Sequence, residues 1–229
     1  MPWPLAYREH ISDGRRLKGY RLMTVIGSDF IFIHVPKCAG KSISRRLGGV
    51  SHGVPGHAPL SYFSPEVRRN RLAFGFVRNP WDRLVSAYIF ITTKSVRPAD
   101  DAEHRELAKS VGFKRWLMET ELYYSHEDRT REPSLPPFQR RSQMFWLDGC
   151  DFIGQTENID ADFREVEAKI ARSKSAWYKL RFSGPIERRN STQRRDYRSY
   201  YDEESEAFVA THFAPEIKRF GYAFDSEGA

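Results

Sequence analysis

Two lysines and a serine stand in a short segment whose composition suits the binding of an anion. The segment covers residues 36–42 and reads Pro-Lys-Cys-Ala-Gly-Lys-Ser. Lys37 and Lys41 would supply positive charge, and the hydroxyl of Ser42 would donate a hydrogen bond. Backbone N–H groups of a turn that enters a helix add to this, because they point where the positive end of the helix dipole lies. We predict a phosphate or sulfate site here; the alternative is an ordinary strand-helix turn with solvated lysines.

A second segment places an arginine and a serine in a similar setting. Arg78 directly follows an apolar run, and Ser86 lies two helical turns further on. The planar guanidinium of arginine suits a phosphate group, because it can donate two parallel hydrogen bonds. The alternative is that Arg78 pairs with Asp82 and that Ser86 only lets a helix pack closely.

Both segments lie between a predicted strand and a predicted helix. The uninterrupted apolar runs at 30–35 and 72–77 are typical of strands that are buried on both faces of a parallel sheet. After the first run, Ile43 and Leu47 have helical spacing. After the second, Asn79 is a plausible N-cap and Pro80 fits the first helical position. Repeated strand, turn and helix predict an α/β fold with a P-loop-like central parallel sheet flanked by helices, and both turns at the carboxyl edge of the sheet.

The remaining sequence predicts one domain that spans residues 1–229. Residues 1–28 look like a lead-in, and residues 93–150 look like a helical insertion near the acceptor site. A short strand is expected at 150–154 and an amphipathic helix at 159–171. Terminal helices are expected over 197–224, where Pro215 opens the last helix and Gly221 closes it.

The closest general pattern for the first loop is the Walker A sequence of nucleoside triphosphatases, G-x-x-x-x-G-K-[ST]. Gly40, Lys41 and Ser42 match its end, but Val35 stands where its first glycine should be. A P-loop kinase is therefore the alternative function.

Residues 32–43 (FIHVPKCAGKSI) resemble the 5′-phosphosulfate loop of carbohydrate sulfotransferases, in particular the group with heparan 2-O- and chondroitin 4-O-sulfotransferases. Residues 76–88 (FVRNPWDRLVSAY) are similar to the 3′-phosphate motif of that family. The segments 151–158, 197–202 and 220–224 resemble its later blocks. The resemblance implies transfer of a sulfuryl group from 3′-phosphoadenosine 5′-phosphosulfate (PAPS), which leaves as adenosine 3′,5′-bisphosphate, to a hydroxyl, expected to be that of a glycan.

The resemblance also implies roles for individual residues. Lys37 would stabilise the charge on the leaving group, and Arg78 and Ser86 would hold the 3′-phosphate. Arg194, Arg195 and Tyr197 could lie near the nucleotide. The expected donor-binding residues are Pro36, Lys37, Cys38, Ala39, Gly40, Lys41, Ser42, Arg78 and Ser86.

Sulfuryl transfer to a hydroxyl also requires a base near neutral pH. Among seven histidines, His57 follows the first predicted helix and precedes the second strand, and its Gly-His segment resembles the one that supplies the base in the 2-O-sulfotransferase branch. His52 is the second choice. We expect His34, at the end of the first strand, to orient the loop by hydrogen bonding.

Several basic and aromatic residues are candidates for binding an anionic saccharide, the alternative being a solvated charged face over a core tryptophan. They are Arg68, Arg69, Arg71, Lys114, Arg115, Arg140 and Arg141, with Trp116 or Trp146 as a stacking platform.

The composition sets the broad class. Apolar residues make up 40% of the 229 residues, which is a globular composition, and the net charge of +7 favours anionic ligands. Acidic residues interrupt the basic ones, which argues against a nucleic-acid-binding module. Cys38 and Cys150 are expected to be thiols. No apolar run approaches the roughly 18 residues of a membrane span, so we expect a soluble cytoplasmic protein. The alternative is an enzyme of the Golgi lumen, if the chain is a trimmed form. We expect no metal site.

Overall fold

The computed structural model describes residues 24–47, 56–93, 100–120, 141–173, 186 and 194–225. The chain divides into two compact units. The first comprises residues 1–77 and 143–189, and we call it the sheet unit. The second comprises residues 78–142 and 190–229, and we call it the helical unit.

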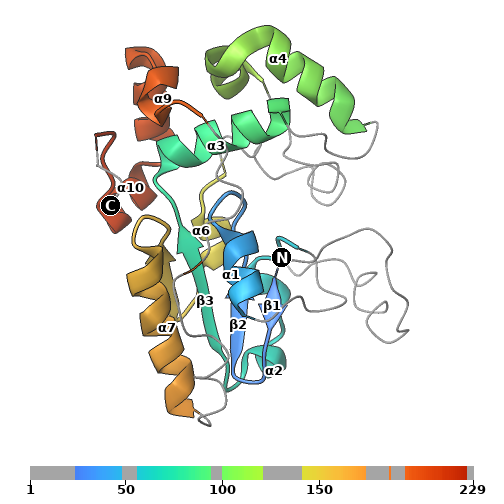
Figure 1. The fold of residues 1–229 in the computed structure, drawn as a ribbon, viewed down its shortest axis with the longest axis vertical. Coiled ribbons are helices and arrows are strands. Elements are labelled where there is room, and N and C mark those ends of the chain that lie inside the picture. Colours follow the sequence, from blue (N-terminus) through green and yellow to red (C-terminus); the bar gives the residue numbers. More distant parts are fainter. Residues whose placement is uncertain are drawn as a thin grey trace. The chain divides into compact units, whose positions relative to one another are not determined.

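The four described strands of the sheet unit form one mixed sheet (Figure 1). They are β1 (Val25–Ile26), β2 (Phe30–Ile33), β3 (Leu72–Val77) and β4 (Phe152–Gln155), in that order across the sheet. The last three are parallel, while β1 pairs antiparallel with β2. The α/β prediction is confirmed. The strand β1, which lies inside the predicted lead-in, was not anticipated.

Side chains that alternate along the strands give the sheet two apolar faces. Phe32, Phe74 and Phe76 share a core with Ile43 of α1 (Gly40–Arg46) and Phe163 of α7 (Ile159–Ser173). These two helices therefore cover one face.

The other face is covered by α6 (Met144–Leu147). A Cβ atom at Gly75 would lie only 2.2 Å from Cδ2 of Leu147, so the helix packs where the glycine has no side chain. α6 also contacts the 3₁₀ turn η3 (Leu60–Tyr62). The short helix α2 (Pro65–Arg68) precedes β3 and is capped by the Ser64 side chain.

The helical unit is built around α3 (Pro80–Thr93). Its N-terminus is capped as predicted, because Oδ1 of Asn79 accepts a hydrogen bond from the backbone N–H of Trp81 at 3.1 Å. The helix contacts α4 (Asp100–Glu119), the 3₁₀ turn η5 (Tyr197–Tyr200) and α9 (Glu203–His212). α4 is interrupted at Gly112, where φ is 76°.

The end of the chain also forms as predicted. α10 (Ala214–Phe220) has a proline in its first turn and ends at Gly221, whose φ of 68° is the left-handed conformation that glycine adopts without strain. Among the described residues, no helix is long and apolar enough to cross a membrane, and no group of side chains could hold a metal ion.

Candidate functional site

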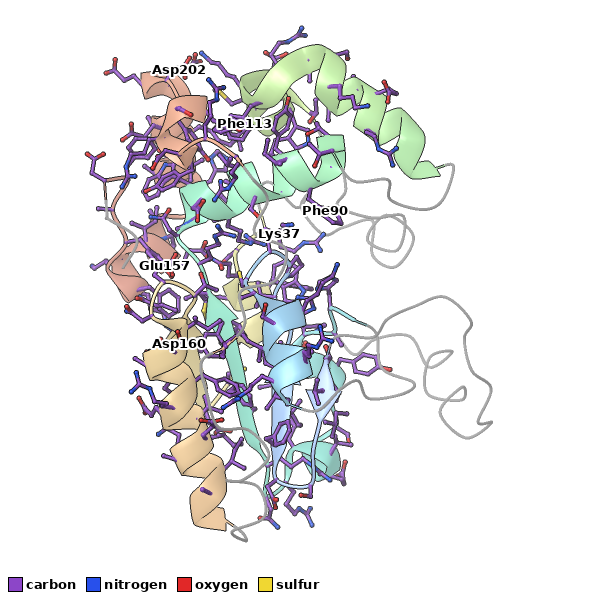
Figure 2. The ribbon with its side chains drawn as sticks, viewed as in Figure 1. Lys37, Phe90, Phe113, Glu157, Asp160 and Asp202 are labelled. Atoms are coloured by element: carbon purple, nitrogen blue, oxygen red, sulfur yellow. The ribbon has the colours of Figure 1, made fainter. Side chains whose placement is uncertain are left out.

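The first predicted loop lies at the carboxyl end of β2, at the same edge of the sheet as the end of β3. Figure 2 shows Lys37 at this end of the sheet unit, in the loop that leads into α1. Val35 is buried, and its carbonyl oxygen accepts a hydrogen bond from the backbone N–H of Cys38 at 3.2 Å. The chain therefore turns tightly after the strand, and Val35 is part of the packed turn rather than the opening of a wider Walker-type loop.

Backbone conformation distinguishes this loop from an ordinary turn. Lys37 has a φ of 68° and Ala39 a φ of 54°, and among the other described non-glycine residues a positive φ occurs at Asn70. Left-handed conformations cost an ordinary residue about 1–3 kcal/mol and concentrate at functional sites. Left- and right-handed residues in alternation turn successive N–H groups toward one side, which forms an anion-binding concavity. The positive φ at both Lys37 and Ala39 therefore marks this loop as a candidate site.

The side chain of Cys38 connects the loop to the residue that precedes α6 in the sheet unit. Its side chain is 1% exposed, and its thiol donates to the side-chain oxygen of Gln143, which is itself fully buried. Gln143 is not among the predicted site residues. It lies outside every recognised motif, and no local pattern links it to the loop.

Gly40 is required by packing rather than by approach to a ligand. A Cβ atom there would lie 1.5 Å from Cδ2 and 1.9 Å from Nε2 of His34. The imidazole of His34 therefore occupies the space beside Gly40 and supports the loop by packing, while its hydrogen bond is with the backbone of Gly56 and not with the loop.

His34 is held neutral by its surroundings. Burial lowers its pKa well below the ordinary value, and the positive charge of a protonated His57, of Lys41 and of Lys37 would lower it further; a hydrogen bond with the backbone of Gly56 acts in the opposite direction. His34 is thus a packing and orienting group, and it is not suited to hold a proton near neutral pH.

His57 lies directly against His34. The two ring centroids are 4.4 Å apart, and Nδ1 of His57 lies 3.1 Å from the main-chain oxygen of His34. The ring is partly exposed. His57 therefore lies beside the segment that follows β2.

The other loop residues differ in exposure. Lys41 is exposed, whereas Ser42 is buried within the first turn of α1. Pro36 is buried and Ala39 half-buried. His52, the second choice for the base, lies outside the described residues.

In the helical unit, Arg78 forms an ion pair with Asp82. This pair was the alternative to phosphate binding that we gave for Arg78. Nε of Arg78 donates to Oδ2 of Asp82 at 2.7 Å. The guanidinium of Arg194 binds the other oxygen, Oδ1, of the same carboxylate. Two arginines separated by 116 positions in the sequence thus meet at one aspartate, and the three charges sum to +1.

This cluster of Arg78, Asp82 and Arg194 is largely shielded from solvent. The three side chains are 23%, 18% and 15% exposed, respectively. The Nη1 atom of Arg194 is buried and has no hydrogen-bond partner among the described residues. A buried guanidinium with a donor left over suits a further anion. Ser86 is buried one helical turn beyond Asp82, on the same side of α3.

The C-terminal segment fixes the start of α3, where this cluster lies. The hydroxyl of Tyr201 donates to the main-chain oxygen of Trp81 at 2.9 Å. The side-chain amide of Asn79 donates to the main-chain oxygen of Ala223 at 3.0 Å. Arg195, which we had grouped with Arg194, is exposed and stacks over Tyr200. Tyr197 is buried and its hydroxyl donates to the main-chain oxygen of Phe224.

Three of the residues predicted to bind a saccharide lie at the other end of the sheet from the loop. Arg68, Arg69 and Arg71 precede β3, so they lie at the amino end of the sheet; β3 has six residues and is about 20 Å long, which separates them from the loop. Arg71 is used structurally, because its Nε donates to the main-chain oxygen of Gly27 at 3.0 Å.

The remaining candidates have structural partners. Lys114 pairs with Asp202, Arg115 pairs with Glu119, and Arg141 is buried. Trp116 and Trp146 are core residues, 0% and 2% exposed, so neither offers a stacking platform. Arg140 lies outside the described residues.

Comparison with known proteins gives one match. A model of a sulfotransferase family covers residues 22–223, which includes both motif segments and the later blocks. Searches of curated proteins and of solved structures returned no significant match.

Proposed function

Because the chain belongs to the sulfotransferase family, we propose that it transfers the sulfuryl group of PAPS to a hydroxyl of an acceptor, with His57 as base. Membership of the family supports sulfuryl transfer from a sulfonate donor in general. The choice of PAPS, and of a carbohydrate as the acceptor, follows from the resemblance of residues 32–43 and 76–88 to the donor-binding segments of carbohydrate sulfotransferases.

The reaction is an in-line displacement at sulfur. The acceptor oxygen forms a bond to sulfur while the bond from sulfur to the bridging oxygen of the 5′-phosphate breaks. The electron pair of that bond stays on the departing phosphate, and the hydroxyl proton moves to His57. The products are a sulfate ester and adenosine 3′,5′-bisphosphate. Holding the reactants in line can lower such a barrier by about 7–11 kcal/mol.

In this proposal, the loop after β2 binds the 5′ end of the donor. The observation that carries the proposal is the strained loop after β2, in which Lys37 has a φ of 68° and the neighbouring His57 lies against the end of the same strand. Lys37 would stabilise negative charge on the leaving oxygen, and the backbone N–H groups of the loop would share it.

In this proposal, residues at the start of α3 bind the 3′-phosphate. Arg78 would bind it through its guanidinium and Ser86 through its hydroxyl. The meeting of two guanidinium groups at Asp82, and the Nη1 atom of Arg194, which has no hydrogen-bond partner in the described part of the chain, support this assignment and add Arg194 to it. Asp82 would hold the two guanidinium groups in place before the nucleotide binds.

The experiment that tests the proposal combines binding and transfer. Calorimetry should show that the protein binds adenosine 3′,5′-bisphosphate, and ³⁵S-labelled PAPS should label a hydroxyl acceptor from a panel of glycans, lipids and small molecules without added magnesium. Labelling by γ-³²P-ATP instead would favour the kinase alternative. A protein with no affinity for adenosine 3′,5′-bisphosphate would rule the proposal out.

A further inference from the structure

His57 is held from two sides within the sheet unit. On one side, its Nδ1 lies 3.1 Å from the main-chain oxygen of His34. On the other, its own main-chain oxygen accepts a hydrogen bond from Nε1 of Trp146 at 3.1 Å. Trp146 is 2% exposed, so its indole is fixed by the core around it. These contacts restrain both the backbone and the ring of the histidine.

The contact with His34 determines which ring nitrogen carries the proton. A carbonyl oxygen can only accept a hydrogen bond, so Nδ1 must be the donor and must be protonated. In the neutral ring the electron pair is then on Nε2. This is the tautomer that a base requires if Nε2 is the atom that meets the substrate.

We infer that the carbonyl of His34 and the indole of Trp146 are the positioning groups for the base, and that Nε2 of His57 is the atom that takes the proton from the acceptor hydroxyl. The inference rests on the proposed function for the reaction itself, while the tautomer and its cause are properties of the protein alone. In the step, the O–H bond of the acceptor breaks as its oxygen bonds to sulfur, and the proton forms an N–H bond at Nε2.

The charges around the pair are consistent with this role. The charged and titratable groups that act on His34 are His57, Lys41 and Lys37. His34 is neutral, since burial lowers its pKa. A proton that His57 takes from the acceptor is therefore next to a neutral ring at His34.

The tautomer can be measured without activity. Two-bond ¹H–¹⁵N NMR spectra of histidine-labelled protein separate protonated from bare ring nitrogens, and a His57→Gln variant assigns the signals. We expect a protonated Nδ1 and a bare Nε2 for His57 at pH 8. The opposite tautomer would overturn the inference.

The role of Trp146 is tested with a matched pair of variants. Trp146→Phe keeps an aromatic ring but removes the N–H group, and misplacement of the base should lower kcat by about tenfold to a hundredfold with the donor KM unchanged. Trp116→Phe changes another fully buried tryptophan, in the helical unit, and should leave kcat close to wild type.

The outcomes are distinguishable. Equal loss of kcat in both tryptophan variants, or a change confined to KM, would show that Trp146 acts only as a core residue. If the wild-type protein neither binds adenosine 3′,5′-bisphosphate nor transfers sulfate, the proposed function fails, while the NMR result still decides whether His34 fixes the tautomer.

Discussion

The sulfur of Cys38 lies 3.1 Å from Oε1 of Gln143, although 105 residues separate them in the chain. Both side chains are buried, and the bond connects the lysine loop to the segment that begins α6. A buried hydrogen bond of this kind contributes about 0.5–1.5 kcal/mol. The loop that we propose to bind the donor is thus held by a residue that belongs to no motif.

We predict that Cys38→Ala weakens donor binding because the loop loses this attachment. The dissociation constant of adenosine 3′,5′-bisphosphate should rise by about threefold to tenfold, as measured by calorimetry. Cys38→Ser keeps a donor and should lose less. Cys150→Ala is the control, since Cys150 precedes β4 at the amino end of the sheet. Equal weakening by Cys38→Ala and Cys150→Ala would contradict the prediction.

Lys37→Ala should reduce sulfuryl transfer by about a hundredfold to a thousandfold while the protein stays folded, because charge on the leaving group would no longer be stabilised. At a φ of 68°, alanine has the same steric disadvantage as lysine. The substitution therefore leaves the backbone strain of the loop unchanged. Circular dichroism checks the fold and single-turnover kinetics measure the chemistry.

The control for this prediction is Lys41→Ala. It removes an exposed lysine from the same loop and should have a much smaller effect. Near-normal turnover of Lys37→Ala would remove Lys37 from the transition state.

Arg78→Ala and Arg194→Ala should each weaken binding of adenosine 3′,5′-bisphosphate far more than binding of adenosine 5′-phosphate. The loss of one charge-assisted hydrogen bond of about 1.5–3 kcal/mol corresponds to about tenfold to a hundredfold in affinity. Arg195→Ala, which changes the exposed neighbour, is the control. If both nucleotides lose equal affinity in Arg78→Ala, that arginine does not recognise the 3′ group.

The stability of the protein should fall as the pH is lowered from 7 to 5. Burial lowers the pKa of His34 well below its ordinary value of 6.5, so between the two values the unfolded chain binds more protons than the folded one. The free energy of unfolding therefore rises with pH in this range. The contribution that comes from neutral His34 is lost on acidification. Urea unfolding at several pH values measures the slope.

A His34→Gln variant has no titrating group at this position, so its free energy of unfolding should depend less on pH. His212→Gln, which replaces an exposed histidine, should retain the wild-type slope. Identical slopes in all three proteins would show that His34 does not control the acid sensitivity.

Local patterns in the sequence were sufficient for most of the elements around the site. The run at 72–77 is β3 to the residue, because a strand buried on both faces needs apolar side chains throughout. Asn79, Pro80 and Gly221 were recognised because each meets a specific backbone requirement of a helix end. β1 was missed because two residues are too few to show an alternating pattern.

The contacts that complete the site could not be predicted in the same way. Arg194 reaches Asp82 over 112 positions, and Trp146 reaches His57 over 89. Such pairs depend on tertiary packing, and no regular spacing of residues in the sequence marks them. The choice between the two roles given for the basic and aromatic residues is of the same kind, because charge alone does not reveal that Lys114 pairs with Asp202 or that Trp116 is buried in the core.

The left-handed residues Lys37 and Ala39 limit what can be done with the loop outside this protein. We expect a free peptide to relax both to right-handed or extended conformations, because residues 30–47 alone lack the bond from Cys38 to Gln143 and the surrounding core. Neither a synthetic peptide nor a graft of the motif onto another strand-helix junction should therefore capture the nucleotide. A transplanted loop would need a partner equivalent to Gln143 for Cys38.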